Sequence, residues 1–250
     1  MTRVDGHAHF HADNSLDLFL QSAVENLLDT DESVGVLLLA HIGSEQPLTS
    51  IRKSNDLNRN WTRSEPDSTS LLFRRDDGFS IVVIAGRQIV TAEKLELLTL
   101  CTDQLVPSGM PVRESIQMAS SQSAIPVVPW GFGKWWFSRG KVLRDLIQSD
   151  FEYRWLIGDS GCRVRGLIPP MIAEATKAGI ATVAGSDPLP LESHRTRVGS
   201  YGSVLNGTID LNRPTEWMRD ALRNLDSAPA FGQCRSLSQF LRDQIGLRIA

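Results

Sequence analysis

The stretch Val4-Asp5-Gly6-His7-Ala8-His9-Phe10 sets the expected fold, because it is typical of a first β-strand that carries two histidines. Residues two apart on a strand point to the same face, so His7 and His9 project together. Two imidazoles on one face can bind one divalent ion through their Nε2 atoms. Two ordinary buried histidines are the simpler alternative, but a His-x-His pair at the end of a first strand favours the metal.

Apolar runs and stretches of helical periodicity alternate along the rest of the chain. A helix is predicted over Leu16–Leu28, and Val34–Ala40 predicts a strand buried on both faces. Thr91 is typical of a helix N-cap, with Leu95–Leu100 supplying the apolar face. Further strands are predicted over Ser70–Arg74, Phe79–Ala85, Ile125–Val128, Tyr153–Ile157 and Ile180–Ala184, and further helices over Pro111–Ala119, Ser138–Gln148 and Pro170–Ala178.

Seven or so strands alternating with helices predict a parallel α/β architecture. A length of 250 residues suits one (β/α) TIM-like barrel. We therefore expect such a barrel, distorted or with fewer than eight regular strands, although an open sheet gives the same pattern. The chain is expected to form a single domain over 1–250. Residues 43–68 are expected to be an insertion or mobile loop, and 212–250 a C-terminal helical extension.

Composition and charge indicate which classes of partner to expect. The formal net charge is −3, with both signs scattered and no basic run, so we expect no nucleic-acid partner. No apolar run is long enough to span a bilayer, so no membrane association is expected. Three cysteines at wide spacings fit neither a disulfide framework nor a zinc site. With no signal peptide evident, these features predict a cytoplasmic protein, open to homo-oligomer formation, that acts on a small-molecule substrate.

A second chemical signal, Gly185-Ser186-Asp187, directly follows the predicted strand Ile180–Ala184. Functional groups of α/β barrels lie at the carboxyl ends of strands, which is where Asp187 stands. A carboxylate there can bind a cation or accept a proton from water. The alternative is an N-cap for the next helix, but Pro188 and Pro190 disfavour a helix start at this point.

The pair of motifs, a first-strand His-x-His and a late Gly-Ser-Asp, resembles the amidohydrolase superfamily and the related polymerase and histidinol phosphatase (PHP) domains. These are barrels of metal-dependent hydrolases. The resemblance implies that His7, His9 and Asp187 are metal ligands, and that Asp187 is also a candidate catalytic base for the water.

The chain departs from both families at the remaining ligands. No histidine occurs between His41 and His194, whereas amidohydrolases usually supply two from middle strands. Leu189 stands where PHP domains usually place a histidine two residues after the aspartate. We therefore expect one divalent ion, zinc first, with manganese or iron as alternatives.

Several polar and aromatic residues follow other predicted strands and are candidate substrate contacts. Lys134 and Arg163 are expected to act with Asp187 in catalysis by orienting the substrate. The plainer alternatives are aromatic packing at the rim, a tight turn at Gly158–Arg163 and surface arginines beside the Gly/Ser-rich loop Gly199–Ser203. The predicted substrate-binding residues are Trp130, Asp159, Arg195, Arg197 and Gln88.

The expected activity is that of a metal-dependent hydrolase acting through a metal-activated water on a small anionic or sugar-containing substrate. Two alternatives stay open. A barrel that has lost the middle ligands would bind a ligand or partner without turnover, and a metal-dependent lyase or isomerase would have the same ligands.

Overall fold

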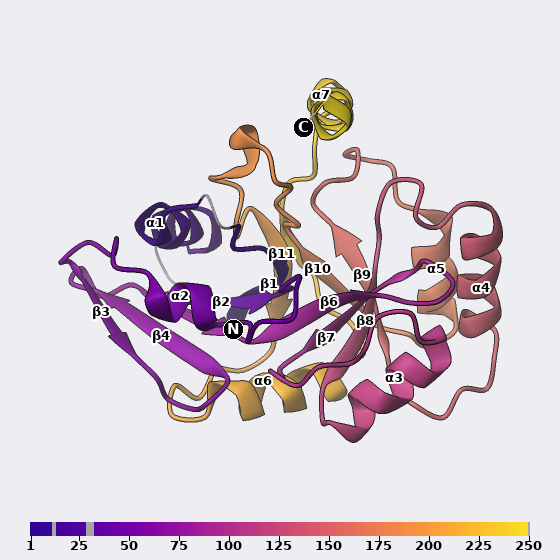
Figure 1. The fold of residues 1–250 in the computed structure, drawn as a ribbon, viewed down its shortest axis with the longest axis horizontal. Coiled ribbons are helices and arrows are strands. Elements are labelled where there is room, and N and C mark those ends of the chain that lie inside the picture. The colour runs from indigo at the N-terminus through magenta and orange to yellow at the C-terminus, as the bar shows by residue number, and fades with distance from the viewer. Residues whose placement is uncertain (12–13, 29–32, 250) are drawn as a thin grey trace.

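The computed structural model describes residues 1–11, 14–28 and 33–249. Within them the strands form one mixed sheet of twelve, in the order β3-β4-β5-β2-β1-β11-β10-β9-β8-β7-β6, with β12 paired to β11 (Figure 1). The strand bounds are β1 Thr2–Ala8, β2 Val34–Leu39, β3 Trp61–Ser64, β4 Ser70–Arg75, β5 Ser80–Ile84, β6 Gly86–Val90, β7 Glu96–Leu100, β8 Ile125–Pro129, β9 Leu156–Ser160, β10 Thr182–Gly185, β11 Tyr201–Leu205 and β12 Ala230–Gly232.

Helices flank this sheet on several sides. In Figure 1, α3, α4 and α5 lie together beside β8 and β9, α6 lies below the sheet, and α7 stands apart at the top. The bounds are α1 Leu16–Leu27, α2 Thr49–Lys53, α3 Val112–Ser121, α4 Phe137–Ile147, α5 Pro170–Lys177, α6 Pro214–Arg223 and α7 Leu237–Ile249, with a short 3-10 turn at Glu192–His194. No helix in the described ranges combines the length and apolar character needed to cross a membrane.

The expected (β/α) barrel is wrong, because antiparallel pairs interrupt the parallel alternation. The segment after Thr91 is not a helix: Glu96–Leu100 is strand β7, antiparallel to both β6 and β8. The Gly/Ser-rich segment expected as a loop forms β11, which pairs antiparallel with β1 and with β10. Gly202 permits this pairing, since a Cβ there would lie 2.2 Å from the Val4 carbonyl oxygen.

The strand β2 shows how the sheet is covered on both faces. Alternate side chains of a strand point to opposite faces, and Val36 and Leu38 pack in one apolar cluster while Leu37 and Leu39 pack in another. The first cluster includes residues of α6, and the second includes the apolar face of α1. A strand buried on both faces is continuously apolar, as the sequence predicts here.

The end strand β6 approaches β2, the fourth strand of the order, at the carboxyl end of β2. The backbone N–H of His41 donates to the Gly86 carbonyl oxygen at 3.0 Å, and the N–H of Gln88 donates to the His41 carbonyl oxygen at 2.9 Å. This contact brings β6, the last strand in the order, beside β2, which neighbours the strand that carries His7.

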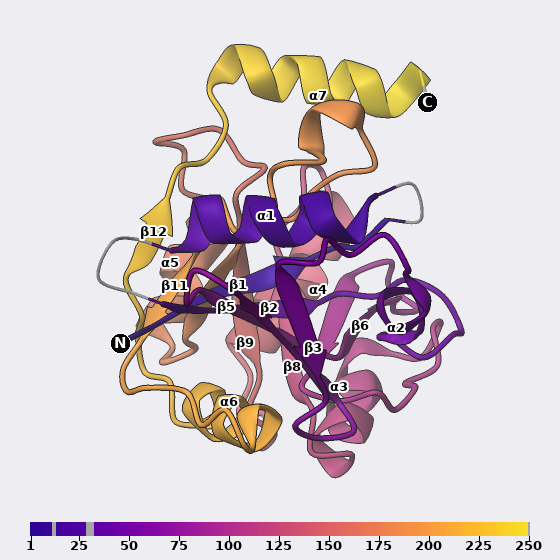
Figure 2. The ribbon, with the colours of Figure 1, turned by 90° about the vertical axis from the view of Figure 1, so that its left-hand side faces the viewer.

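The two segments singled out in the sequence carry regular structure. Residues 43–68 contain α2 and β3, and Trp61 at the start of β3 is buried. Residues 212–250 contain α6, β12 and α7. Figure 2 shows α7 running lengthwise at the top of the molecule, above α1, and α6 at the opposite end.

Candidate metal centre

The imidazoles of His7 and His9 and the carboxylate of Asp187 converge at one end of the sheet. His7 lies on β1, His9 follows that strand directly, and Asp187 follows β10. The two segments are joined by the backbone N–H of Asp187, which donates to the His7 carbonyl oxygen at 2.8 Å. Gly185 allows this approach, because a Cβ there would lie 2.3 Å from the His7 nitrogen.

The three donor atoms form a near-equilateral triangle. The Nε2 atoms of His7 and His9 are 3.0 Å apart, and they lie 3.5 and 3.6 Å from Asp187 Oδ1. Zinc bonds of about 2.1 Å at tetrahedral angles place neighbouring ligand atoms about 3.4 Å apart. All three side chains are at least four-fifths buried, at 7%, 9% and 16% exposed. Donor type, spacing and burial therefore fit one divalent ion.

Asp187 is held in position through both its backbone and its carboxylate. It adopts a left-handed conformation, with φ 50°, which turns the chain back toward the histidines. Its Oδ2 accepts the Ser160 hydroxyl at 2.9 Å, which leaves Oδ1 facing the imidazoles. Burial acts to raise the pKa of Asp187, but His7, His9 and Ser160 outweigh it, so the pKa lies below its ordinary value. The carboxylate is ionised, as a metal ligand must be.

Asp5 organises the backbone beneath the triad and was not singled out in the sequence. Its Oδ1 accepts the N–H groups of His7 at 3.1 Å and Ser186 at 2.8 Å. Its Oδ2 accepts the Gly199 N–H at 2.8 Å and also the Ser186 hydroxyl. Burial raises the pKa of Asp5, and these hydrogen bonds oppose that rise. The signal available in the sequence was an acidic residue two positions before His7.

Gln88 is the predicted substrate-binding residue that lies nearest the triad. It stands on β6, and its Oε1 is 3.1 Å from the Nε2 atom of His7. This amide oxygen faces the point on which the other donors converge. Gln88 is therefore placed as a fourth donor, through its amide oxygen, or as a contact to the reacting group.

A cavity of about 360 Å³ opens beside the triad. The predicted residues Trp130 and Lys134 line it, together with Glu96, which the sequence did not single out. The Lys134 ammonium lies 2.7 Å from Glu96 Oε1, so its charge is paired within the cavity wall. The full lining is His9, His11, Ile42, Gln88, Glu96, Trp130, Gly131, Phe132, Lys134, Cys162, Asp187, Pro188, Leu189, Pro190, Gln244 and Leu247.

Four of the predicted catalytic and substrate-binding residues lie outside this lining. Arg163 forms a buried two-pronged ion pair with Asp159, at 2.6 and 2.8 Å, and the Tyr201 hydroxyl donates to the same carboxylate at 2.6 Å. The two charged groups that were expected to contact the substrate therefore pair with each other. Arg197 donates to the Gly161 carbonyl oxygen at 3.4 Å, and Arg195 likewise is not among the lining residues.

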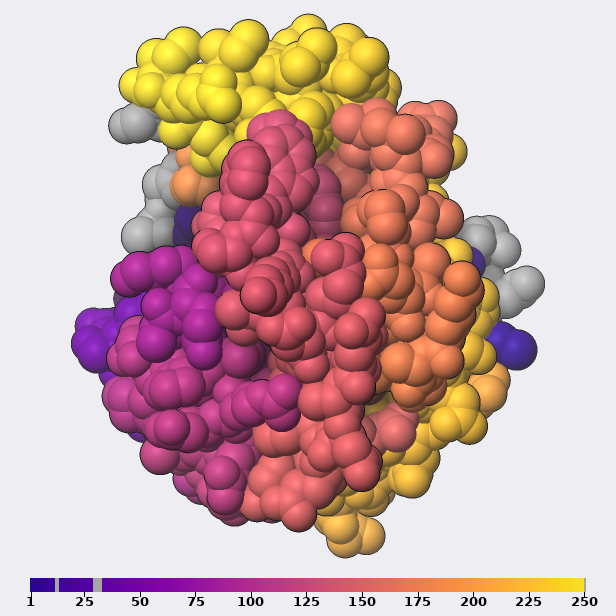
Figure 3. Space-filling view, turned by 90° about the vertical axis from the view of Figure 1, so that its right-hand side faces the viewer, coloured from indigo at the N-terminus to yellow at the C-terminus, as the bar shows by residue number. Residues whose placement is uncertain are grey.

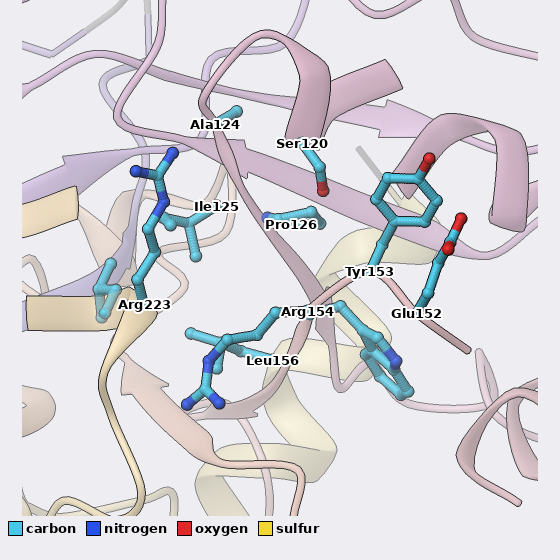
Figure 4. Close-up of a pocket in the computed structure, with 11 residues that line it drawn as sticks. Ser120, Ala124, Ile125, Pro126, Glu152, Tyr153, Arg154, Leu156 and Arg223 are labelled. Carbon is cyan, nitrogen blue, oxygen red and sulfur yellow. The ribbon is translucent and has the colours of Figure 1, made fainter. Parts of the chain in front are cut away.

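Two further cavities are present, one close to the triad and one far from it. One of about 250 Å³ adjoins the other side of His9 and includes His41 and Glu45. Another of about 290 Å³ lies where β8 and β9 begin, at the ends opposite the triad (Figure 4). Its two arginines, Arg154 and Arg223, donate to backbone carbonyl groups of neighbouring segments.

No known sequence family and no characterised protein matches the sequence. Solved structures do match the fold. PsfC from Pseudomonas syringae PB-5123 aligns over 100% of this chain and 99% of its own, with 12% identity and a TM-score of 0.59. The lesion-specific endonuclease PfuEndoQ from Pyrococcus furiosus aligns over 89% of this chain and 56% of its own, with 13% identity and a TM-score of 0.53.

A third neighbour is Endonuclease Q in complex with a 27-mer duplex that carries an abasic lesion at the active site. It aligns over 98% of this chain and 66% of its own, with 12% identity and a TM-score of 0.52. This chain therefore spans about two thirds or less of the endonucleases' length. At these identities the likeness establishes a shared fold.

The expectation that nucleic acid is excluded as a partner is overturned by this third neighbour, whose fold holds a DNA duplex at its active site. The expectation rested on a net charge of −3 spread along the chain. Net charge describes the whole surface, whereas a nucleic acid meets only the local charge around one site. The composition of the chain therefore does not exclude a nucleic-acid partner.

Proposed function

We propose that this protein is a metal-dependent hydrolase that cleaves a phosphoester. The observation that carries the proposal is the triangle of His7 Nε2, His9 Nε2 and Asp187 Oδ1, with edges of 3.0 to 3.6 Å at the edge of a cavity. A divalent ion held there supplies Lewis-acid chemistry, in that it lowers the pKa of water and polarises the bond to be broken. Zinc suits the two imidazoles and one carboxylate, with manganese or iron as alternatives.

The phosphoester is proposed from the fold and from the cavity. Two structural neighbours are endonucleases, enzymes that act on nucleic acid. The cavity of about 360 Å³ has the size of a small organic group, and Trp130 and Phe132 supply flat apolar walls. In the proposed reaction a water oxygen bonds to phosphorus, the bond from phosphorus to the leaving oxygen breaks, and the leaving alcohol takes up a proton.

The residues around the triad have separate roles in this proposal. Asp187 serves as a ligand, because Ser160 and the two histidines keep its carboxylate ionised and occupied. Gln88 orients the reacting group next to His7. Lys134 attracts the anionic substrate, while its contact with Glu96 holds the ammonium on the cavity wall.

The proposal is tested with p-nitrophenyl phosphate and bis(p-nitrophenyl) phosphate, assayed on protein loaded separately with zinc, manganese and iron. Parent protein is expected to release p-nitrophenol from at least one ester, and His7→Ala is expected to lose this activity while its melting curve stays cooperative. His41→Ala is the matched control, because His41 lines the neighbouring cavity and lies outside the triad. Equal activity of parent and His7→Ala would contradict the proposal.

Binding without turnover is the second candidate. The observation in its favour is that Lys134, the cavity's cation, is neutralised by Glu96, while both oxygens of Asp187 already have partners. This candidate predicts that the metal-loaded parent binds phenylphosphonate yet releases no product from either ester. A lyase or isomerase would use the same ligands and would also leave both esters intact.

A further inference from the structure

The last helix, α7, forms the side of the metal cavity that lies away from the sheet. In Figure 3 it lies across the top of the molecule, and the surface beneath it is hollowed. Its residues Gln244 and Leu247 line the cavity together with His9 and Asp187. A segment more than fifty residues beyond Asp187 in the sequence thus completes the proposed substrate site.

One face of α7 is turned toward the molecule. Phe240 and Asp243 are buried on it, and the half-buried Gln244 and the 39% exposed Leu247 follow at the helical spacing of three and four residues, where both line the cavity. The opposite face is exposed: Leu237, Leu241, Ile245 and Ile249 are 52% to 80% exposed. Among the described residues of α7, Phe240 is the only buried apolar side chain, so apolar burial alone does not account for the orientation of this helix.

A buried polar cluster fixes the orientation instead. Asp243 accepts two hydrogen bonds from Arg235, at 2.6 and 2.8 Å, and its Oδ2 lies 3.0 Å from His194 Nε2. The three side chains are 0% to 8% exposed. Buried charges are strongly destabilising without their partners, so rotation of α7 that separated this cluster would be costly.

The same cluster connects α7 to the segment that carries the metal ligand. His194 Nδ1 accepts the backbone N–H of Leu189 at 3.1 Å, and Leu189 follows Asp187 by two residues. Phe240 adds an edge-on contact with Phe132, with ring centroids 5.0 Å apart. The helix is thus held in one register against both walls of the cavity.

We infer that α7 is the specificity-determining element of this site, through Leu247 and Gln244. Leu247 packs against a ring on the substrate that also contacts Trp130, and the Gln244 amide pairs with a polar substituent on that ring. The preferred substrate class is accordingly a ring-bearing phosphoester. The inference rests on the proposed function for the phosphate, but the selection of the ring does not depend on turnover.

The test compares two non-hydrolysable probes, phenylphosphonate and methylphosphonate, by titration calorimetry on metal-loaded protein. Parent protein is expected to bind the ring-bearing probe at least about tenfold more tightly, as burial of a phenyl ring allows. Leu247→Trp fills the space and is expected to reduce this ratio to about twofold or less, with methylphosphonate affinity unchanged. Ile245→Trp, on the exposed face of the same helix, is the matched control and keeps the ratio.

Gln244→Ala is the second variant, which leaves the packing intact and removes the amide. It is expected to weaken 4-hydroxyphenylphosphonate about fivefold and to leave phenylphosphonate unchanged, as loss of one hydrogen bond predicts. Metal content is measured on every sample. A parent that binds no metal would defeat the proposed function. A metal-loaded Leu247→Trp protein that keeps the parent's ratio would overturn the role of α7.

Discussion

The Asp5 carboxylate accepts the backbone N–H of Ser186 at 2.8 Å and so joins the first strand to the segment that carries Asp187. This single contact spans 181 positions of the sequence. It explains how a His-x-His motif at one end of the chain and an aspartate far along it face each other. The geometry of the candidate metal triad depends on the backbone position that Asp5 fixes, as well as on the three side chains themselves.

Replacement of Asp5 with alanine is expected to destabilise the fold and the triad together. Three buried N–H groups and one hydroxyl would lose their acceptor, which predicts a loss of about 3 kcal/mol in the free energy of unfolding. Urea denaturation measures this loss, with Asp145→Asn on the exposed surface of α4 as control. Unchanged stability in Asp5→Ala would show that these hydrogen bonds do not organise the site.

Gln88→Glu is expected to strengthen metal binding. The substitution places a second carboxylate about where the Gln88 oxygen now lies, 3.1 Å from His7 Nε2. Because the added oxygen ligand is anionic, the affinity for a divalent ion is expected to rise by about tenfold or more. Competition with a chelator of known affinity measures the change. Gln46→Glu, on the segment that contacts Arg87, serves as a charge-matched control. Equal affinity in parent and Gln88→Glu would place Gln88 outside the coordination sphere.

The Glu96–Lys134 pair is expected to tune affinity for an anionic substrate. Glu96→Gln removes the charge that neutralises Lys134 and is expected to lower the KM for p-nitrophenyl phosphate about twofold to fivefold, as a partly exposed ion pair predicts. Lys134→Ala is expected to raise KM by a similar factor, with kcat little changed. Steady-state kinetics at low and high salt measures both, because salt screens the effect. A KM that moves in the same direction in both variants would contradict this role.

His194 is expected to make stability sensitive to acid. Burial lowers its pKa, Asp243 acts to raise it, and Arg197 and Arg235 add to the lowering, with a net pKa below the ordinary 6.5. The unfolded chain therefore takes up a proton near pH 6.5 that the folded protein resists. Stability should fall as pH decreases through and below that value.

Replacement of His194 with asparagine tests this dependence. The variant has no titrating group at this position, so its stability should change less between pH 7 and pH 5 than that of the parent. Chemical denaturation at several pH values, on metal-free protein, gives the two profiles. Parallel profiles would show that His194 does not contribute to the pH dependence.

Local rules indicated the members of the triad, and the resemblance to metal-dependent hydrolases implied that they bind one ion together. Side chains two apart on a strand share a face, which places His7 beside His9, and the strand-end position of Asp187 marks it as a functional group. The structure brings these three together at the spacing of a metal site. Both rules act within a few residues, and so both are visible in the sequence.

The sheet topology was not predictable from the same rules. The run Leu95–Leu100 has apolar residues that fit a helix face as well as a strand, and only its pairing with β6 and β8 makes it a strand. Likewise, Gly202 in an apparent loop is required by the close approach of β1. Pairing between distant segments decides these elements, and periodicity carries no information about it.

Only some of the residues around the triad were predicted correctly, again because contacts between distant segments decide which side chains reach the cavity. Asp159 and Arg163 stand four residues apart and pair with each other, so neither reaches the cavity. Gln244 and Leu247 reach it only because a buried cluster orients α7. Which charges are satisfied internally, and which helix covers a site, depend on tertiary packing.

The metal content of the purified protein shows directly whether His7, His9 and Asp187 hold an ion. Elemental mass spectrometry of parent, His7→Ala, Asp187→Ala and the control His41→Ala would be run after reconstitution with zinc, manganese or iron. About one equivalent of one ion is expected in parent and in His41→Ala, with loss of that ion in the other two variants. A parent that retains no ion, or triad variants that retain as much as the parent, would contradict this expectation.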